Sequence, residues 1–119
     1  MECYYQTYNT ENVDSLASYY HPEVELTSEA GIMKGAEAVL ATYRQIIGIF
    51  HDKMTPTSIH IDGQIAIVAI IDRFTAKVDV EDFLGMQVAA GKSFELKLRG
   101  TYEADSDNLF RTIVIERLG

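Results

Sequence analysis

The chain has 119 residues, 47% of them hydrophobic, which is enough for one core, and we expect a single domain over residues 1–119. Eighteen acidic against ten basic residues give a formal net charge of −8, which excludes nucleic acid and anionic membrane surfaces as expected partners. The single cysteine, Cys3, excludes an internal disulfide, and the sequence shows neither a secretory signal nor an apolar run of about 18 residues, so we expect a cytoplasmic protein without a membrane span.

Two short helices are predicted at the start of the chain. The first carries tyrosines at i, i+1 and i+4, which places Tyr4, Tyr5 and Tyr8 on one side. A break follows, where asparagine and threonine side chains compete with the helical backbone. The second helix shows an apolar stripe from Val13 to Tyr20 and should end before Pro22.

A short strand and a longer helix are predicted next. Residues 23–27 alternate acidic and aliphatic side chains, which is typical of a strand at the rim of a sheet. Gly31 and Gly35 then indicate a loop. From Ala36 onward the apolar side chains fall on one helical face, and this helix should end near His51.

The hydrophobic pattern changes after Pro56 from a helical to an alternating period. Turn signals divide the rest of the chain into four expected strands, over residues 58–61, 64–80, 92–104 and 109–117. Helices come first and hairpin-linked strands last, which is the order of an α+β protein with an antiparallel sheet. The glycine-containing connection over residues 80–91 is a candidate lid for a pocket, and the alternative is an ordinary long hairpin in a dimer contact.

The two longest strands agree on which of their faces is apolar. We expect these faces to point toward the helices, with the inward residues Val68, Ile70, Phe74, Phe94, Leu96, Leu98 and Tyr102. The opposite faces are charged, and there Arg73 and Lys77 would pair with acidic side chains of the neighbouring strand. Asp72 is the exception in the inward row. Because unpaired burial of a carboxylate costs several kcal/mol, Asp72 must be hydrogen-bonded, neutralised or in contact with a wet cavity.

The outward face is not purely polar, because it also carries Ile67, Ala69 and Ile71. The last strand is expected to add Ile113 and Ile115 to this face, opposite Thr112 and Val114. We therefore expect a homodimer that forms through the outer face of the sheet.

Several fragments, in this order and spacing, resemble the SnoaL-like branch of the nuclear transport factor 2-like superfamily, which includes ketosteroid isomerase and polyketide cyclases. They are YQTYNTENVDSLASYYHPEVEL over residues 5–26, KGAEAV over 34–39, DFLG over 82–85 and GKSFEL over 91–96. The resemblance covers nearly the whole chain. It implies an α+β fold in which a cone-shaped, curved antiparallel sheet wraps around N-terminal helices, as in cystatin-like proteins, and encloses a pocket for a small hydrophobic molecule.

The ketosteroid isomerase pattern, laid on the first helices without gaps, matches at one of its three functional positions. Its oxyanion-stabilising tyrosine falls on Tyr4. Ser28 stands in the place of its aspartate base, with Glu29 as the nearest acid, and Arg99 stands near the place of its second acid. The isomerase reaction needs a carboxylate to move a proton, so a base at another position is required.

Asp72 and Tyr4 are the candidate catalytic residues. Apolar neighbours disfavour the charged form of Asp72, which suits a general acid or base, while the alternative is a structural carboxylate that caps a hydroxyl or amide. The candidate substrate-binding residues are Tyr8, Tyr20, Tyr43, Phe74 and Tyr102. The tyrosines offer phenol donors to a carbonyl group, and the alternative for them is core packing.

The sequence assigns neither a metal nor a cofactor. His51 is either a helix cap or an acid at the pocket rim, whereas His21 and His60 are interpreted as structural or exposed. No phosphate-cradling glycine loop and no nucleophile-elbow serine is found.

Three functions are compatible with these residues. The first is a cofactor-independent enzyme that moves a proton on a hydrophobic carbonyl compound, as ketosteroid isomerases or polyketide cyclases do. The second is a non-catalytic binding or dimerisation domain of the same fold. The third, a metal-dependent hydrolase, requires His and Asp side chains that converge.

Overall fold

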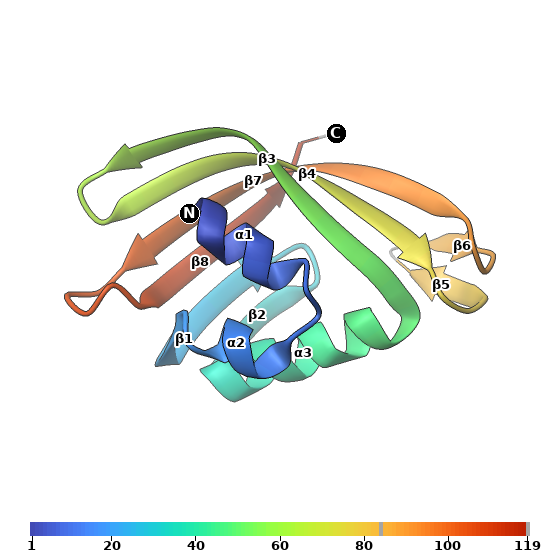
Figure 1. Cartoon of the computed structure of the whole chain (residues 1–119), viewed down its shortest axis with the longest axis horizontal. Coiled ribbons are helices and arrows are strands. Elements are labelled where there is room, and N and C mark those ends of the chain that lie inside the picture. The colour runs from blue at the N-terminus through green and yellow to red at the C-terminus, as the bar shows by residue number, and fades with distance from the viewer. Residues whose placement is uncertain (84, 119) are drawn as a thin grey trace.

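A computed structural model describes residues 1–83 and 85–118 (Figure 1). The elements follow in the order α1 (Glu2–Tyr8), α2 (Val13–Ala17), β1 (Tyr20–Ser28), β2 (Gly31–Lys34), α3 (Ala36–Ile49), β3 (Phe50–Asp62), β4 (Ile65–Ala76), β5 (Val80–Phe83), β6 (Met86–Val88), β7 (Ser93–Ala104) and β8 (Phe110–Arg117). Helices precede the long strands, as the hydrophobic periodicity predicts.

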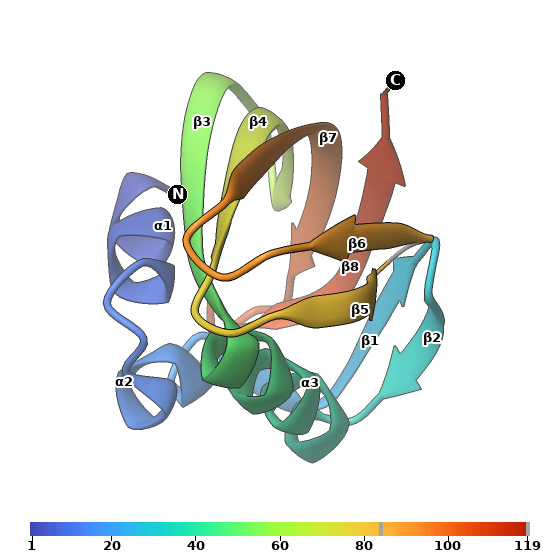
Figure 2. The same ribbon diagram turned by 90° about the vertical axis from the view of Figure 1, so that its right-hand side faces the viewer.

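Six strands form one curved sheet in the order β2-β1-β8-β7-β4-β3. All neighbours are antiparallel except β1 and β8, which come from opposite ends of the chain and run parallel. The sheet curves around the helices, and the β5–β6 hairpin, a separate two-stranded unit, projects from the ends of β4 and β7 (Figures 1 and 2). This arrangement leaves the concave face of the sheet and the helices to enclose the core.

The strand faces are oriented as their alternation predicts. Val68, Ile70 and Phe74 of β4 are buried, and so are Leu96, Leu98 and Tyr102 of β7. The charged row of β7 faces outward. Ile113 and Ile115 of β8 also face inward, because they align with Tyr102 and Gly100, so this strand adds neither isoleucine to the outer face.

Two strands begin earlier than their proline residues indicate. β1 begins at Tyr20 and contains Pro22, where the second helix was expected to end, and β3 begins at Phe50 and contains Pro56 instead of starting at Ser58. The pairing of each strand is irregular at its proline, between Tyr20 and Glu25 in β1 and between Pro56 and Ser58 in β3. Irregular pairing tolerates a residue that cannot donate to the ladder.

Two other local predictions need correction. The glycine-punctuated stretch after residue 30 pairs with β1 as strand β2 and does not form a loop. Residues 80–91 contain the β5–β6 hairpin, as the alternative to the lid expects. Lys77 binds Glu11, with Nζ 2.6 Å from Oε1, and not an acid on the neighbouring strand. Arg73 aligns with Glu95 across β4 and β7, which is the register that the expected ion pair requires.

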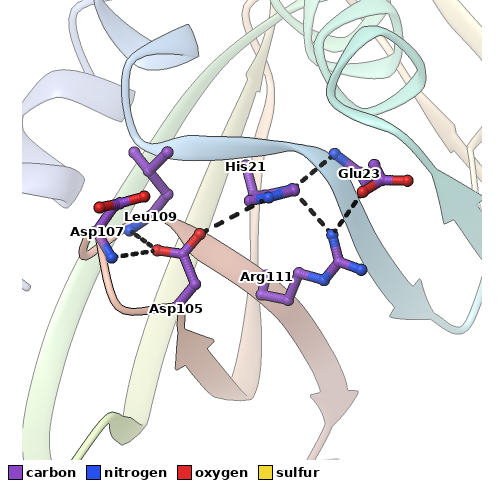
Figure 3. A network of polar contacts seen from close by, with 6 residues as sticks. All are labelled: His21, Glu23, Asp105, Asp107, Leu109 and Arg111. Carbon is purple, nitrogen blue, oxygen red and sulfur yellow. Dashed lines mark hydrogen bonds and ion pairs between the residues drawn. The ribbon is translucent and has the colours of Figure 1, made fainter.

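A surface network ties β1 to the turn between β7 and β8 (Figure 3). Nδ1 of His21 accepts hydrogen bonds from the backbone N–H of Glu23 and from Arg111, at 2.9 Å each, and Nε2 faces Asp105 at 3.8 Å. Asp105 also accepts from the backbone N–H groups of Asp107 and Leu109. His21 is therefore placed structurally, outside the core.

Within the described ranges, 1–83 and 85–118, no helix has the length and hydropathy that crossing a membrane requires.

Candidate active site

The concave face of the sheet and the helices enclose a cavity of about 400 Å³ whose wall is mostly apolar. This volume lies in the range of small-molecule sites. Every sequence-predicted site residue lines it: Tyr4, Tyr8, Tyr20, Tyr43, Asp72, Phe74 and Tyr102. Their roles in binding or catalysis stay predictions.

Two carboxyl groups meet in this cavity. Asp72 of β4 is 2% exposed, and Asp52 of β3 is 4% exposed. Asp52 aligns with Phe74 and Met54 aligns with Asp72, so the acids occupy diagonal positions on the inward face of neighbouring strands. The two carboxyl groups lie close enough that each shifts the pKa of the other. Because two buried carboxylates this close would repel each other, the pair holds one proton between them.

Tyr8 of α1 orients Asp52. Its hydroxyl donates to Oδ2 of Asp52 at 2.7 Å, and the hydroxyl of Tyr43 in α3 donates to the backbone carbonyl of Tyr8 at 2.5 Å. Oδ1 of Asp52 and Oδ1 of Asp72 are buried without a hydrogen-bond donor from the described residues. Asp52 is therefore held by α1, whose Tyr8 is in turn bound by α3, and both acids retain hydrogen-bonding capacity.

The pKa values of the two acids differ because their surroundings differ, and the proton of the pair resides on Asp72. Burial raises the pKa of Asp72, and both the hydrogen bond to Asp52 and the charge of Asp52 raise it further, well above neutral pH. Burial also raises the pKa of Asp52, but the hydrogen bonds from Asp72 and Tyr8 oppose that shift. A singly protonated pair therefore carries its negative charge on Asp52.

The other cavity tyrosines are hydrogen-bonded in pairs. The hydroxyls of Tyr4 and Tyr20 lie 2.7 Å apart, and the hydroxyl of Tyr5 donates to that of Tyr102 at 3.0 Å. Burial raises the pKa of Tyr4, so its phenol stays protonated. Because two phenols that bind each other use one hydrogen, the Tyr4–Tyr20 pair keeps one hydrogen to donate.

Aromatic rings line the side of the cavity beside Asp52. Phe83 of the β5–β6 hairpin lies in an aromatic cluster with Phe50, Phe74 and Phe94, with ring centroids 4.8 to 5.9 Å away. Phe83 also lines the cavity. The segment predicted as a lid thus supplies part of the cavity wall.

The residues at the two acid positions of the ketosteroid isomerase pattern lie in different parts of the structure. Ser28 and Glu29 line the cavity, and Glu29 accepts a hydrogen bond from Arg117 at 3.2 Å. Arg99 instead projects from the outer face and pairs with Glu116 at 2.8 Å. The position of the second acid in that pattern is therefore outside the site.

Sequence reasoning missed Asp52 as a site residue, because it reads residues 50–57 as the end of a helix and the start of a loop. The signal that would find it is the alternation Phe50, Asp52, Met54, which repeats the mix of apolar and acidic residues around Asp72. The alternation indicates a strand only if the preceding helix is taken to end at residue 49, whereas the sequence pattern extends that helix to about His51.

The candidate metal ligands do not converge. In the part of the chain that the structure describes, no three His, Cys, Asp or Glu side chains are placed to hold one ion. His51 is 65% exposed in its side chain and faces Glu11 at 3.5 Å, away from the cavity.

A sequence profile of the SnoaL-like domain family matches residues 1–108. No curated protein matches the sequence. Among solved structures, the chain is similar to a candidate polyketide cyclase from Xanthomonas campestris pv. campestris, with 12% identity, a TM-score of 0.81, and 97% of this chain and 84% of that chain covered.

Two further structures are similar. TsrD from Streptomyces laurentii has 23% identity and a TM-score of 0.78, with 98% of this chain and 84% of that chain covered. An LEH-like epoxide hydrolase from M. tuberculosis has 12% identity and a TM-score of 0.78, with 98% and 78% covered.

At these identities the likeness shows the fold alone. Solved structures with cystatin-like and ketosteroid isomerase-like folds match as well, which confirms the predicted fold class. Since the family profile spans most of the sequence, the chain belongs to the SnoaL-like domain family.

Proposed function

We propose that this protein is a cofactor-independent enzyme that moves a proton on a small hydrophobic carbonyl compound, in the manner of an isomerase or cyclase. One observation carries the proposal: two buried carboxyls, Asp52 and Asp72, line the same apolar cavity. Burial and the neighbouring acid raise the pKa of Asp72, so the pair holds one proton. Acids whose environments push their pKa values apart are the arrangement that general acid–base chemistry requires.

The two acids take different roles. When substrate binds, Asp72 turns its proton from Asp52 to the carbonyl oxygen and stabilises the enolate that forms. Asp52, held by Tyr8, takes a proton from the adjacent carbon and returns it to another carbon of the substrate. This assigns the base to Asp52, whereas the sequence points to Asp72 for that step.

The tyrosine pair gives a second donor. Tyr4 lines the cavity, and its pair with Tyr20 keeps one phenol hydrogen for the substrate oxygen. Tyr4 is thus proposed as an oxyanion stabiliser, as the resemblance to ketosteroid isomerase implies. Tyr102 and Phe74 form the apolar wall against which the substrate packs.

The experiment is proton exchange on carbonyl probes. The chain is incubated in deuterated water with small ketones, lactones and steroids, and exchange beside the carbonyl is followed by NMR. We expect Asp52→Asn to lower the exchange rate by about 100-fold or more, as removal of a general base does. Tyr4→Phe should lower it less, because Asp72 still binds the oxygen. Exchange at the uncatalysed rate with every probe, or an unaffected rate in both variants, would refute the proposal.

A non-catalytic binding domain is the alternative. It predicts that Asp52→Asn and Tyr4→Phe leave ligand affinity nearly intact and that no probe exchanges. Crystals soaked with the same probes, read for density beside Asp72, distinguish a bound but unreacted ligand from an empty cavity.

We also propose that two copies associate through the outer face of the sheet. Ile65 and Ile67 of β4 are 40% and 41% exposed, and Ala69 and Ile71 continue this row half-buried. A row of exposed isoleucines on a sheet is typical of an interface. Sedimentation velocity tests this proposal: Ile67→Lys should convert a dimer to a monomer, and a monomeric unmodified chain would contradict it.

A further inference from the structure

The charge on the Asp52–Asp72 pair is not neutralised by the protein. Among residues 1–83 and 85–118, no Lys, Arg or His forms an ion pair with either carboxyl group. One shared proton leaves the pair with one negative charge. Both carboxyls also keep Oδ1 buried without a donor from these residues. A buried charge in this state is unfavourable unless a ligand pairs with it.

The groups that face the pair are neutral or acidic on every element packed against it. They are Tyr8 from α1, Tyr43 from α3, Tyr102 from β7 and Glu11 from the connection between α1 and α2. Burial raises the pKa values of the three tyrosines, so they stay uncharged. Glu11 adds a negative charge that Lys77 pairs with at 2.6 Å.

The cation that lines the cavity is committed elsewhere. Arg117 stands at the end of β8 and pairs with Glu29 at 3.2 Å. One strand, β7, separates Arg117 from the strand of Asp72, and two strands, β7 and β4, separate it from the strand of Asp52. The charges of Arg117 and Glu29 cancel. The net charge of the cavity wall is therefore −1, and it lies on the acid pair.

The rest of the wall suits a cation with an apolar body. Phe74 aligns with Asp52 and contacts Phe83 at a ring-centroid distance of 5.3 Å. Aromatic ring faces attract cations, and this attraction strengthens where water is excluded. The formal charge of −8 draws cations toward the molecule as a whole.

We propose that the cavity binds a hydrophobic amine as its ammonium cation, which donates hydrogen bonds to Asp52 and Asp72. An ammonium group carries several donors, and the pair offers two buried oxygens without donors. The arriving positive charge favours the ionised form of Asp72, so the shared proton leaves the pair and passes to solvent. Amine binding goes beyond the proposed reaction, which needs only a neutral carbonyl compound.

Calorimetry with matched probes tests the inference. The whole chain is titrated with phenethylamine and with phenethyl alcohol, each in two buffers that differ in ionisation enthalpy. We expect the amine to bind about 10- to 100-fold more tightly than the alcohol, which is the range for hydrogen bonds to charged groups. The amine should release close to one proton and the alcohol none. Equal affinities, or amine binding without proton release, would overturn the inference.

Two variants separate the charge from the proton. Asp72→Asn removes the shared proton but keeps the charge of Asp52, so amine affinity should persist while proton release disappears. Asp52→Asn leaves a neutral pair, so the amine should bind no more tightly than the alcohol. Asp62→Asn, an exposed position at the end of β3, makes the same change in net charge and should alter neither property.

Circular dichroism checks that each variant folds. If Asp52→Asn does not fold, proton release by the unmodified chain and its loss in Asp72→Asn still decide the inference. Its failure is distinct from failure of the proposed reaction: proton exchange on ketones without amine binding overturns only the cation site, whereas amine binding without exchange overturns only the reaction.

Discussion

At the residue scale, Tyr8 holds Asp52 in place. Its hydroxyl donates the hydrogen bond that Asp52 accepts from helix α1. The hydrogen bond is 2.7 Å long and buried, and it joins residues that are 44 positions apart. Removing a hydrogen-bond donor from a buried carboxylate makes its negative charge less favourable. Tyr8 is therefore a positioning residue whose effect passes through Asp52.

The substitution Tyr8→Phe should raise the pKa of Asp52, because it removes a hydrogen bond that favours the charged form. We expect the free energy of unfolding to fall by about 1–3 kcal/mol at neutral pH. Urea unfolding measures the change in stability. Tyr19→Phe is the matched control, since the Tyr19 hydroxyl is only part-buried and lies 3.3 Å from Thr7. Equal effects of the two substitutions would contradict this role for Tyr8.

Asp72 makes the stability of the fold depend on pH. Its pKa is 3.8 in an ordinary environment and is raised in the folded chain, so above about pH 4 the folded state keeps a proton that the unfolded state has lost. Stability contributed by this group is therefore present at acid pH and decreases as pH rises from the unfolded pKa toward the folded pKa.

The substitution Asp72→Asn should remove this dependence. We expect the unmodified chain to lose about 1.4 kcal/mol of unfolding free energy per pH unit from Asp72 between about pH 5 and about pH 8, and the variant to lack that slope. Urea unfolding across the range measures it. Asp62→Asn should keep the slope, and the same slope in both variants would show that Asp72 is ionised in the folded chain.

At the element scale, β7 makes room for the Tyr102 ring by placing a glycine beneath it. A Cβ on Gly100 would lie 2.6 Å from a carbon of that ring and 3.1 Å from its oxygen. Tyr102 is buried and accepts a hydrogen bond from Tyr5, so the ring cannot move without loss. The small residue in the strand is thus explained by the aromatic side chain two positions later.

The substitution Gly100→Ala should destabilise the fold by about 1–3 kcal/mol, because overpacking displaces the ring and the cavity wall with it. Thermal and urea unfolding measure the loss, and near-ultraviolet circular dichroism reports the tyrosine environment. Gly48→Ala is the matched control: no atom lies within 4 Å of its added Cβ in helix α3. This control should stabilise the fold by about 0.5–1 kcal/mol. A neutral Gly100→Ala would mean that the ring lies elsewhere.

At the scale of the whole molecule, the β5–β6 hairpin completes the enclosure. It forms its own two-stranded sheet, and Phe83 inserts from it into the aromatic cluster with Phe50, Phe74 and Phe94. A hairpin of this size is only marginally stable alone, so its order depends on such contacts.

The substitution Phe83→Ala should loosen the hairpin while the large sheet remains intact. Hydrogen–deuterium exchange should become faster over residues 80–88 and stay unchanged in β4 and β7. Val78→Ala, which removes an exposed side chain next to the hairpin, serves as control and should leave exchange unchanged. Faster exchange throughout the chain would show instead that Phe83 supports the whole core.

The sequence by itself determined which faces of β4 and β7 are buried, and hence that Asp72 points inward, because side-chain alternation is a property of neighbouring residues. It also determined the order of helices and strands and the family. The alternation at the start of β3 was too short to outweigh Pro56, because a proline inside a strand is tolerated only by an irregular pairing that β4 provides.

Only the tertiary structure decided that Asp52 meets Asp72 and that Tyr8 binds Asp52. The register between β3 and β4 sets the first contact, and the packing of α1 against β3 sets the second. Both contacts join residues far apart in the chain, and no local periodicity encodes such distances. The inward position of Asp72 was therefore predictable from the sequence, whereas its pairing with Asp52 was not.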